Sequence, residues 1–324
     1  MLRTAVIGTG YLGKFHAQKY AVLPDSTLIG VVDINEHSGR PVAEQCATEY
    51  FADHRELLEG VDAVSVVVPT SQHHSIASDF LKAGVHVLVE KPITSCVDQA
   101  WELVQLARQK QLVLQVGSIE RFNAALTEVN SLLKSPRFIE SHRLAGFKPR
   151  SMDINVIMDL MIHDLDIILN LVGAPVVDIA ANGTSVLSNS LDIAQARLTF
   201  ATGCVANITA SRISVKNKRK MHIFQENSCI CVNFQDLTMN HYFKGEGEMF
   251  SGIPHIESRE LSYSDGDSLM REIKDFLRCI RHTLAPRVSG EDGHRVLELA
   301  YRISDIIEGG EPEREKWSRI KFSG

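Results

Sequence analysis

Residues 3–33, RTAVIGTGYLGKFHAQKYAVLPDSTLIGVVD, decide the fold of this 324-residue chain. A short apolar strand over 3–7 runs directly into Gly8-Thr9-Gly10-Tyr11-Leu12-Gly13, and a helical pattern follows at once. In this order of strand, GxGxxG turn and helix, the glycines permit a tight turn and a close approach of the backbone, while the helix N-terminus attracts phosphate. The segment therefore predicts a turn that binds the pyrophosphate of a dinucleotide.

Asp33 ends the second predicted strand, twenty residues beyond Gly13. An acid that binds the ribose hydroxyls is expected at this position. Because a carboxylate would repel a 2′-phosphate, the sequence favours NAD over NADP as the cofactor. Arg40 offers an alternative route to NADP.

Helical and apolar segments alternate as far as Gly117, which predicts a doubly wound parallel sheet over residues 1–118. A helix is expected over 43–52 and buried strands over 63–68 and 85–90. Ligands bind such sheets beyond the C-terminal ends of the strands. Beyond the glycine turn and Asp33, the residues expected at the cofactor crevice are Pro69, Thr70, His73, Glu90 and Lys91. His73 and His74 each read equally well as ordinary residues at a helix start.

Lys91 ends a central strand and precedes Pro92. Burial beside the apolar run would favour a neutral amine, which suits a proton donor, a proton acceptor or a clamp on a hydroxyl. A cis Lys91–Pro92 bond would aim the side chain. The alternative is a lysine that extends into solvent along the surface.

Residues 153–173, DINVIMDLMIHDLDIILNLVG, predict a mostly buried helix with one narrow polar stripe. At about 100° per residue, one face of this helix holds Asn155, Asp159, His163, Asp166 and Asn170. Ionisable groups in apolar surroundings are candidates for a functional site, so we predict an active-site wall. The alternative is a half-exposed helix with short polar side chains. Asp164 falls among the apolar positions, and no pattern in the sequence explains it.

The second predicted domain, over 119–324, is of the α+β class with an open and mostly antiparallel sheet. Polar and apolar residues alternate over 192–200 and 204–214, which is typical of half-buried strands. Two amphipathic helices are expected over 268–283 and 291–308. A sheet with an uncovered face usually buries it against another subunit, so we expect a homodimer or a homotetramer.

Composition argues against several classes of protein. With 34 Lys+Arg against 40 Asp+Glu, the net charge of -6 gives no electrostatic reason to expect nucleic acid as a partner. No apolar run approaches the length of a membrane span. Six cysteines without CxxC pairs and a strand-like N-terminus favour a reduced, cytoplasmic protein. Cys229 and Cys231 should share one face of a strand as packed thiols, and no metal site is expected.

Several motifs in this order resemble the glucose-fructose oxidoreductase/inositol dehydrogenase (Gfo/Idh/MocA) family over nearly the whole chain. They are GTGYLG, Asp33, the run VPTSQHHSIASDFLKAGVHVLVEKPI over 68–93, and Asp159-x3-His163-x2-Asp166. The resemblance implies an N-terminal Rossmann domain, a C-terminal α+β domain, a nicotinamide cofactor and a sugar-like secondary alcohol or aldehyde as substrate. Carried over by position, it makes Lys91, Asp159 and His163 the catalytic group.

The sequence departs from the family where the substrate should bind. Asp153 to Val156 replaces a glycine-rich run, and Met161 replaces a small residue, so the identity of the sugar is poorly inherited. Arg121 is expected to contact either the substrate or a carboxylate. The amide of Asn155 is a further candidate for substrate binding.

Residues 212–220 carry the only concentrated positive charge in the sequence. They read either as a solvated hairpin turn or as a clamp in which Lys218 and Arg219 bind a diphosphate. The stretch SRISVKNKRKMHIFQE over 211–226 resembles the nucleotide-sugar branch of the family, which includes UDP-N-acetylglucosamine 3-dehydrogenases.

These observations lead to the hypothesis of an NAD-dependent oxidoreductase that converts a ring hydroxyl of a sugar or nucleotide-sugar to a ketone. His163 would accept the hydroxyl proton, Lys91 would hydrogen-bond the oxygen, and Asp159 would orient the imidazole or the substrate; the reverse assignment, with Lys91 as base, stays open. The alternatives are a dehydrogenase of inositol, another polyol or a free sugar, a reductase of an aldehyde or imine, and a non-catalytic NAD-binding sensor.

Overall fold

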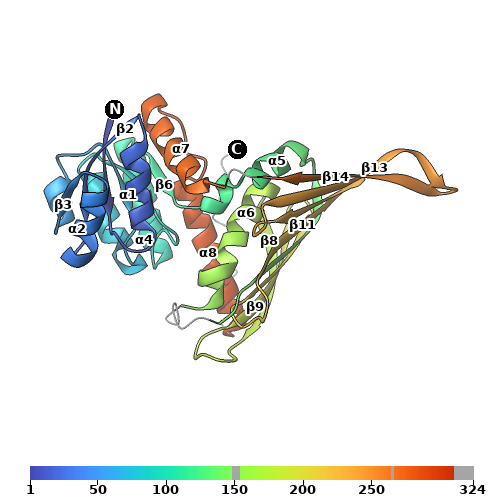
Figure 1. The fold of residues 1–324 in the computed structure, drawn as a ribbon. Helices are drawn as coiled ribbons and strands as arrows, with labels where there is room; N and C mark the ends of the chain where they lie inside the picture. The colour runs from blue at the N-terminus through green and yellow to red at the C-terminus, as the bar shows by residue number, and fades with distance from the viewer. Residues whose placement is uncertain (148–153, 264–265, 310–324) are drawn as a thin grey trace. The chain divides into compact units, whose positions relative to one another are not determined.

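The computed structural model divides the chain into two compact units, which are described one at a time (Figure 1). The first unit comprises Met1–Phe122 and Asp267–Leu297, and the second comprises Asn123–Gly266 and Glu298–Gly324. The structure describes residues 1–147, 154–263 and 266–309. Within the described part of the chain, no helix combines the length and the apolarity that crossing a lipid bilayer requires.

A six-stranded parallel sheet forms the centre of the first unit, in the order β3-β2-β1-β4-β5-β6. Its strands are β1 (Leu2–Ile7), β2 (Ser26–Val32), β3 (Glu49–Phe51), β4 (Ala63–Val66), β5 (His86–Val89) and β6 (Leu114–Val116). The helices that alternate with them are α1 (Gly13–Val22), α2 (Glu36–Gln45), α3 (His73–Lys82) and α4 (Val97–Lys110), with short turns η1 (His54–Leu57), η2 (Thr70–Gln72) and η3 (Ile119–Phe122). The predicted doubly wound sheet is confirmed, and its order reverses between β1 and β4, where such folds bind their ligands.

The helix predicted over 43–52 is wrong in its second half. Helix α2 ends at Gln45, the backbone turns at Ala47 with a positive φ of 50°, and β3 follows. Just before β3 begins, the Thr48 hydroxyl donates a hydrogen bond of 2.8 Å to the carbonyl of Leu28 in β2. From Glu49 onward, β3 pairs with β2. A ten-residue window carries no information about this neighbouring strand, so the sequence pattern could not distinguish the edge strand from a helix.

Helix α7 (Ser268–His282) belongs to the first unit although it follows the second unit in the sequence. Its apolar face, with Ile273 and Phe276, is buried in the same core as Val6 of β1 and Leu88 of β5. The helices predicted over 268–283 and 291–308 are confirmed as α7 and α8 (Gly290–Ile307). The first unit therefore adds 267–297 to the predicted domain over 1–118, because the amphipathic α7 packs on that core.

An eight-stranded sheet forms the second unit, in the order β14-β13-β12-β11-β7-β10-β9-β8. Its strands are β7 (Pro136–Leu144), β8 (Val176–Thr184), β9 (Ile193–Phe200), β10 (Val205–Ser211), β11 (Lys218–Gln225), β12 (Ser228–Asn233), β13 (Thr238–Phe250) and β14 (Ile253–Ser262). Only β7 and β10 pair in parallel among the described residues, so the predicted mostly antiparallel sheet is confirmed, and one parallel pair makes it mixed.

One face of this sheet is buried and the other is open. In β9, Ala194, Ala196 and Leu198 are fully buried, whereas Gln195 and Arg197 are exposed. Helices α5 (Ala124–Leu132) and α6 (Ile162–Val172) lie on the buried side (Figure 1). The predicted alternation is confirmed, and the open face carries none of the helices described for this unit.

The polar-striped helix starts with a π-helical turn, η4 (Ile157–Met161), and continues as α6. The Asn155 side chain caps its start by accepting the N–H groups of Ile157 and Met158 at 3.2 and 3.0 Å. Gly173 ends α6 with a φ of 60°, which a glycine adopts without strain. Asp153, the first residue of the predicted helix, lies outside the described residues. Periodicity predicts one continuous α-helix and does not reveal the π-turn, a feature concentrated at functional sites.

Asp164, which no sequence pattern explained, forms a buried ion pair with Arg143 of β7. The Asp164 carboxylate accepts hydrogen bonds of 2.9 and 3.0 Å from Nε and Nη2 of Arg143. The two side chains are 2% and 4% exposed. Because loss of either partner would leave an uncompensated charge in the interior, this pair fixes α6 on the sheet.

Candidate active site

The three glycines of the turn in the first unit differ in how much space a side chain would have. A Cβ atom on Gly8 would lie 2.4 Å from the carbonyl oxygen of Val67, and one on Gly13 would lie 1.9 Å from the carbonyl oxygen of Gly8. Apart from Gly10 and its two chain neighbours, no described residue has a heavy atom within 4 Å of the position that a Cβ on Gly10 would take. Gly8 and Gly13 are therefore required by packing, whereas Gly10 leaves its backbone open to a ligand. Tyr11 is exposed, and Leu12 precedes the first turn of α1.

Asp33 follows β2 and holds the glycine turn from the side. One carboxylate oxygen accepts hydrogen bonds from the backbone N–H and the hydroxyl of Thr9, at 2.8 and 2.7 Å. The other oxygen accepts the N–H of Asn35 at 2.8 Å. The carboxylate is thus fixed at the C-terminal edge of the sheet beside Gly8 to Gly10.

A pocket of about 580 Å³ lies at this edge of the sheet. Of the residues predicted to bind the cofactor, Gly8, Gly10, Asp33 and Pro69 line it. Asp53, His54 and Arg55 also line it, and the sequence did not reveal them because they follow β3, which was read as helix. An open backbone at Gly10 and a fixed carboxylate on the same pocket fit the pyrophosphate and ribose of a dinucleotide.

Arg40, which offers an alternative route to NADP, lies on the exposed surface of α2. It forms an ion pair with Glu36 one helical turn away, and its guanidinium lies 5.1 Å from the centre of the Tyr50 ring.

His73 joins the segments that follow β4 and β5. It is 1% exposed, and its ring nitrogens lie 2.9 Å from the carbonyl oxygens of Val68 and Pro92. Burial lowers the pKa of His73 below its ordinary value, although both carbonyl contacts oppose this effect. His73 therefore fixes the backbone on which the predicted residues Pro69, Thr70 and Lys91 lie.

Lys91 follows β5, and its bond to Pro92 is cis, as predicted. Its ammonium group donates a hydrogen bond of 3.3 Å to the hydroxyl of Ser118. The carboxylate of the preceding Glu90 lies 3.1 Å from Nε2 of His16. Neither His16 nor Ser118 was among the predicted site residues, since each makes its contact only in the folded sheet.

Asp159 and His163 lie in the second unit, four residues apart on the polar stripe. Asp159 is in the π-turn η4 and His163 is in the first turn of α6, and both are half-buried. Asn155 uses its amide group for the N-cap and for a hydrogen bond of 3.1 Å from Nδ2 to the hydroxyl of Ser304. The stripe thus presents a carboxyl group and an imidazole together, on a helix that the Arg143–Asp164 pair fixes.

The basic segment over 212–220 is not the continuous charged loop that its composition suggested. Arg212 is buried and pairs with Asp192 at 2.8 Å. Lys218 and Arg219 lie in β11, opposite Leu144 and Arg143 of β7. Successive residues of a strand point to opposite faces, and Arg143 points to α6. Arg219 therefore lies on the α6 side of the sheet and Lys218 on the open face.

Arg121 is 5% exposed and donates a hydrogen bond of 2.8 Å from Nη2 to the carbonyl of Arg287. Both residues belong to the first unit. The expected contacts of Arg121 were a substrate or a carboxylate, and the backbone carbonyl of Arg287 is one contact that the structure shows.

The doubly wound sheet, the glycine turn with its acid, and the mixed-sheet unit define a two-domain NAD-binding oxidoreductase. Residues 2–118 match the oxidoreductase family with an NAD-binding Rossmann fold, and residues 127–230 match the GFO/IDH/MocA C-terminal domain. The chain belongs to the Gfo/Idh/MocA family of oxidoreductases.

Individual relatives agree with this assignment. UDP-N-acetylglucosamine 3-dehydrogenase of Acidithiobacillus ferrooxidans is 41% identical over 95% of this chain and 97% of its own length. A solved structure of that enzyme superposes with a TM-score of 0.90, covering 95% of this chain and 98% of the other. Myo-inositol 2-dehydrogenase of Thermotoga maritima is 24% identical over 95% of this chain and 96% of its own. Scyllo-inositol dehydrogenase of Lactobacillus casei, solved with NAD(H), shares the fold with a TM-score of 0.80 at 18% identity, over 95% of this chain and 97% of the other.

We predict that Asp33→Ala weakens NAD binding roughly ten- to a hundredfold, because hydrogen bonds to a charged group contribute about 1.5–3 kcal/mol. NADP should lose less affinity, since the substitution also removes a repulsive charge. Isothermal titration calorimetry with each dinucleotide measures both effects. Thr9→Val is the matched control, because it removes a hydrogen bond to the carboxylate and leaves the carboxylate in place. An equal loss of NAD affinity in both variants would show that Asp33 acts only by holding the turn.

Proposed function

We propose that this chain oxidises the 3-hydroxyl of the N-acetylglucosamine ring of a UDP-sugar to a ketone, with NAD in preference to NADP. The observation that carries the proposal is the 41% identity, over 95% of the chain, to an enzyme named for that reaction. The chain also has a lysine at the strand end and a carboxyl–imidazole stripe, so it has the groups that catalysis needs. A sensor that only binds NAD would not need them.

The cofactor would be held by Gly8, Gly10, Asp33 and Pro69, and it supplies the acceptor for the hydride that leaves the carbinol carbon. His163 removes the proton of the same hydroxyl, because an imidazole titrates near neutral pH. Asp159 lies four residues before His163 and orients it or the substrate. Lys91 hydrogen-bonds the oxygen on which negative charge develops.

Arg219 is the basic residue that we assign to the substrate diphosphate. It shares the α6 side of the sheet with the stripe that carries Asp159 and His163, whereas Lys218 occupies the other face. A guanidinium also matches phosphate oxygens better than an ammonium group does. Of Arg212, Lys218 and Arg219, only Arg219 thus remains as a clamp residue, since Arg212 is buried against Asp192.

Absorbance of reduced nicotinamide tests the substrate, with UDP-N-acetylglucosamine, myo-inositol and glucose each supplied with NAD and with NADP. We expect turnover with UDP-N-acetylglucosamine and NAD. No turnover of UDP-N-acetylglucosamine, together with turnover of inositol or glucose, would contradict the proposal. The chain would then be a polyol or free-sugar dehydrogenase.

The same assay distinguishes the two basic side chains of β11. Arg219→Gln should raise KM for the UDP-sugar roughly tenfold through the loss of a charge-assisted hydrogen bond. Lys218→Gln is the matched control and should stay within about twofold of the unchanged chain, because Lys218 lies on the open face of the sheet, opposite to the α6 side. Equal effects of the two substitutions would contradict the assignment of Arg219.

His163→Ala should reduce kcat by about two to four orders of magnitude, which is the usual contribution of a general base. The dissociation constant of NAD should change little, because His163 lies in the second unit and the pocket in the first. Gln195→Ala, at an exposed position of β9 in the same unit, is the control and should retain activity. A parallel loss of turnover and NAD affinity in His163→Ala would argue for a structural role.

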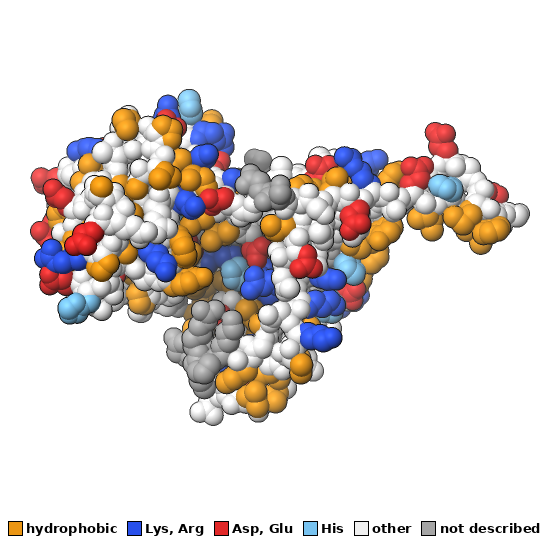
Figure 2. All heavy atoms as spheres, in the orientation of Figure 1, with side chains coloured by type: hydrophobic (Ala, Val, Ile, Leu, Met, Phe, Trp, Pro, Cys, Tyr) orange, Lys and Arg blue, Asp and Glu red, His pale blue; other side chains and the backbone are white. Residues whose placement is uncertain are grey.

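We also propose that the chain forms a homodimer or homotetramer in the cytoplasm. Beyond Phe243, β13 and β14 continue as a two-stranded hairpin past the end of β12, and exposed apolar residues on it are Met249, Phe250, Ile253 and Ile256. Figure 2 shows hydrophobic side chains gathered along this hairpin. The open sheet face adds Phe224 and Tyr242. Apolar surface of this extent is usually covered by another subunit, and six free cysteines suit a reducing compartment.

Light scattering during size-exclusion chromatography should give the mass of a dimer or tetramer for the unchanged chain. The double substitution Phe250→Lys/Ile256→Lys should lower this mass, because it places charges on the apolar hairpin. Val22→Lys, at an exposed position of α1 in the first unit, should leave it unchanged. A monomeric mass for the unchanged chain would refute the proposal.

A further inference from the structure

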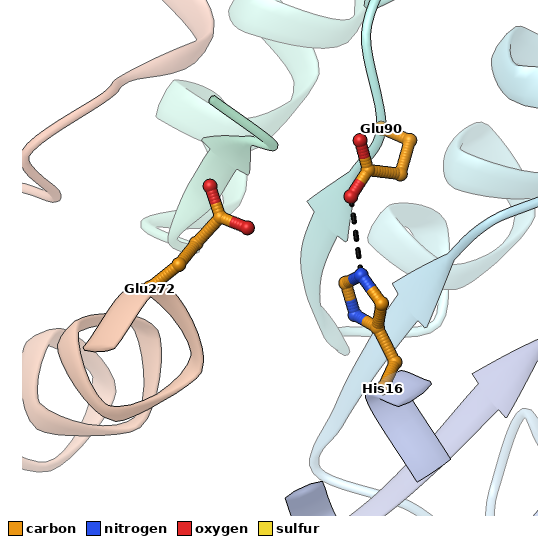
Figure 3. A group of neighbouring side chains, drawn as sticks. All are labelled: His16, Glu90 and Glu272. Atoms are coloured by element: carbon orange, nitrogen blue, oxygen red, sulfur yellow. Dashed lines mark hydrogen bonds and ion pairs between the residues drawn. The ribbon is translucent and has the colours of Figure 1, made fainter. Parts of the chain in front are cut away.

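A cluster of His16, Glu90 and Glu272 lies in the first unit, with His16 and Glu272 buried and Glu90, the residue before Lys91, half-buried (Figure 3). The three residues come from α1, from the end of β5 and from α7. One imidazole nitrogen and one oxygen from each carboxylate all lie within 4.8 Å of one another. His16 and Glu272 are 0% exposed, so two carboxylates and an imidazole share a site that water does not reach freely.

The hydroxyl groups of Tyr20 and Ser65 fix the orientation of His16. The Ser65 hydroxyl lies 3.2 Å from Nδ1 of His16 and 2.9 Å from the Tyr20 hydroxyl. Burial raises the pKa of Tyr20, so its hydroxyl keeps its proton and donates to Ser65. Ser65 can then donate to Nδ1, which leaves the proton of a neutral imidazole on Nε2. That proton is donated to Glu90 at 3.1 Å.

Glu90 occupies a place that only a glycine neighbour permits. A Cβ atom on Gly117 would lie 2.7 Å from the carboxyl carbon and oxygens of Glu90. The second oxygen of Glu90 accepts the backbone N–H of Lys91 at 3.3 Å. Burial by itself raises the pKa of Glu90, but the hydrogen bond from His16 and the nearby Lys91 outweigh it and hold the pKa below its ordinary value. Glu90 is therefore a carboxylate.

Glu272 reaches Lys91 through Ser118. The Glu272 carboxylate accepts the backbone N–H of Ser118 at 2.6 Å, and the Ser118 hydroxyl accepts a hydrogen bond from the Lys91 ammonium at 3.3 Å. The side chain of Gln115 donates to the backbone carbonyl of Glu272 at 3.2 Å. Lys91 is thus held at its backbone by Glu90 and at its ammonium group by Ser118.

We propose that the His16–Glu90–Glu272 cluster positions Lys91 and keeps it in the ammonium form, so that Lys91 serves as a hydrogen-bond donor to the reacting oxygen. The role of Lys91 in the reaction rests on the proposed function, whereas its protonation state does not. The contacts favour a hydrogen-bonded network over a metal site, because both nitrogens of His16 and both oxygens of Glu90 already have protein partners. His16, Glu90 and Glu272 are positioning residues in this scheme.

The charges around Lys91 favour this form. Glu90 brings negative charge, and the titratable groups that face it are His16 from α1, His73 from α3 and Glu272 from α7, besides Lys91 itself. Carboxylates near an ammonium group oppose the loss of its proton, which burial at a strand end would otherwise favour. A protonated lysine cannot accept the hydroxyl proton, so this arrangement leaves the role of base to His163.

The test follows the ¹³Cε signal of Lys91 through a pH titration of the unliganded chain, with the signal identified by its loss in Lys91→Met. Glu90→Gln keeps the size of the side chain and removes its charge. We expect the Lys91 midpoint to move to lower pH by roughly one unit or more. kcat should fall roughly tenfold while the dissociation constant of NAD stays within about twofold. Glu90→Asp keeps the charge and should keep the Lys91 midpoint near its original value.

Glu102→Gln is the matched control, because it also breaks a hydrogen-bonded Glu–His pair, that of Glu102 and His74 at 2.9 Å. It should change neither the Lys91 midpoint nor kcat. An unchanged Lys91 midpoint in Glu90→Gln, with or without a loss of activity, would overturn the proposal. If Glu90→Gln does not fold, Glu272→Gln removes the other carboxyl group of the cluster and provides the same comparison from α7.

The titration separates this inference from the proposed function, since it needs no substrate. If UDP-N-acetylglucosamine is not turned over but the Lys91 midpoint moves as expected, the substrate assignment fails and the inference stands. If the substrate is turned over and the midpoint does not move, the inference alone fails.

Discussion

The close contact between Gly13 and Gly8 is the constraint on which the first unit depends. With no Cβ on either residue, α1 approaches the ends of β1 and β4 more closely than any other side chain would allow. The same approach places His16, one turn into α1, against Ser65 of β4 and the Glu90 carboxylate after β5. The glycine turn that opens a backbone to phosphate thereby also sets the network that includes Glu90, the residue before Lys91. One packing contact therefore shapes both the glycine turn and the network of His16, Ser65 and Glu90.

Asp33 shows how one side chain can serve the fold and the site together. Its carboxylate closes the glycine turn through Thr9 and lines the pocket at the same edge of the sheet. Buried ion pairs have a similar double role in the second unit, where Arg143–Asp164 fixes α6 and Arg212–Asp192 fixes the segment after β10. Burial alone would raise the pKa of Asp192, but hydrogen bonds from Ser188 and Arg212 lower it, so the pair stays charged. In each case the carboxylate accepts hydrogen bonds from more than one N–H or O–H group.

The sequence revealed those features whose causes are local. The glycine turn, Asp33 and the cis Lys91–Pro92 bond follow from short-range patterns, as does the alternation of β9. Features that depend on a distant partner stayed hidden, because a window of ten to twenty residues cannot contain that partner. Strand β3, the α7 helix in the first unit, and the ion pair of Asp164 are of this kind. His16 is the clearest case, since its nearest acceptor lies 74 residues away in the chain. The catalytic roles of Lys91, Asp159 and His163 remain predictions.

The basic segment shows why charge density in a sequence says little about a binding surface until the register is known. Nine consecutive residues over 212–220 read as one cationic loop. In the folded chain Arg212 forms a buried ion pair with Asp192. Lys218 and Arg219 are neighbours in β11, and successive residues of a strand point to opposite faces of the sheet. Pairing of Arg219 with Arg143 then decides which face each side chain occupies, because Arg143 contacts α6. A shift of β11 by one residue would exchange the two faces and bring Lys218 to the side of α6. Strand register, rather than the number of positive charges, therefore decides which basic side chain faces the substrate in the proposed function.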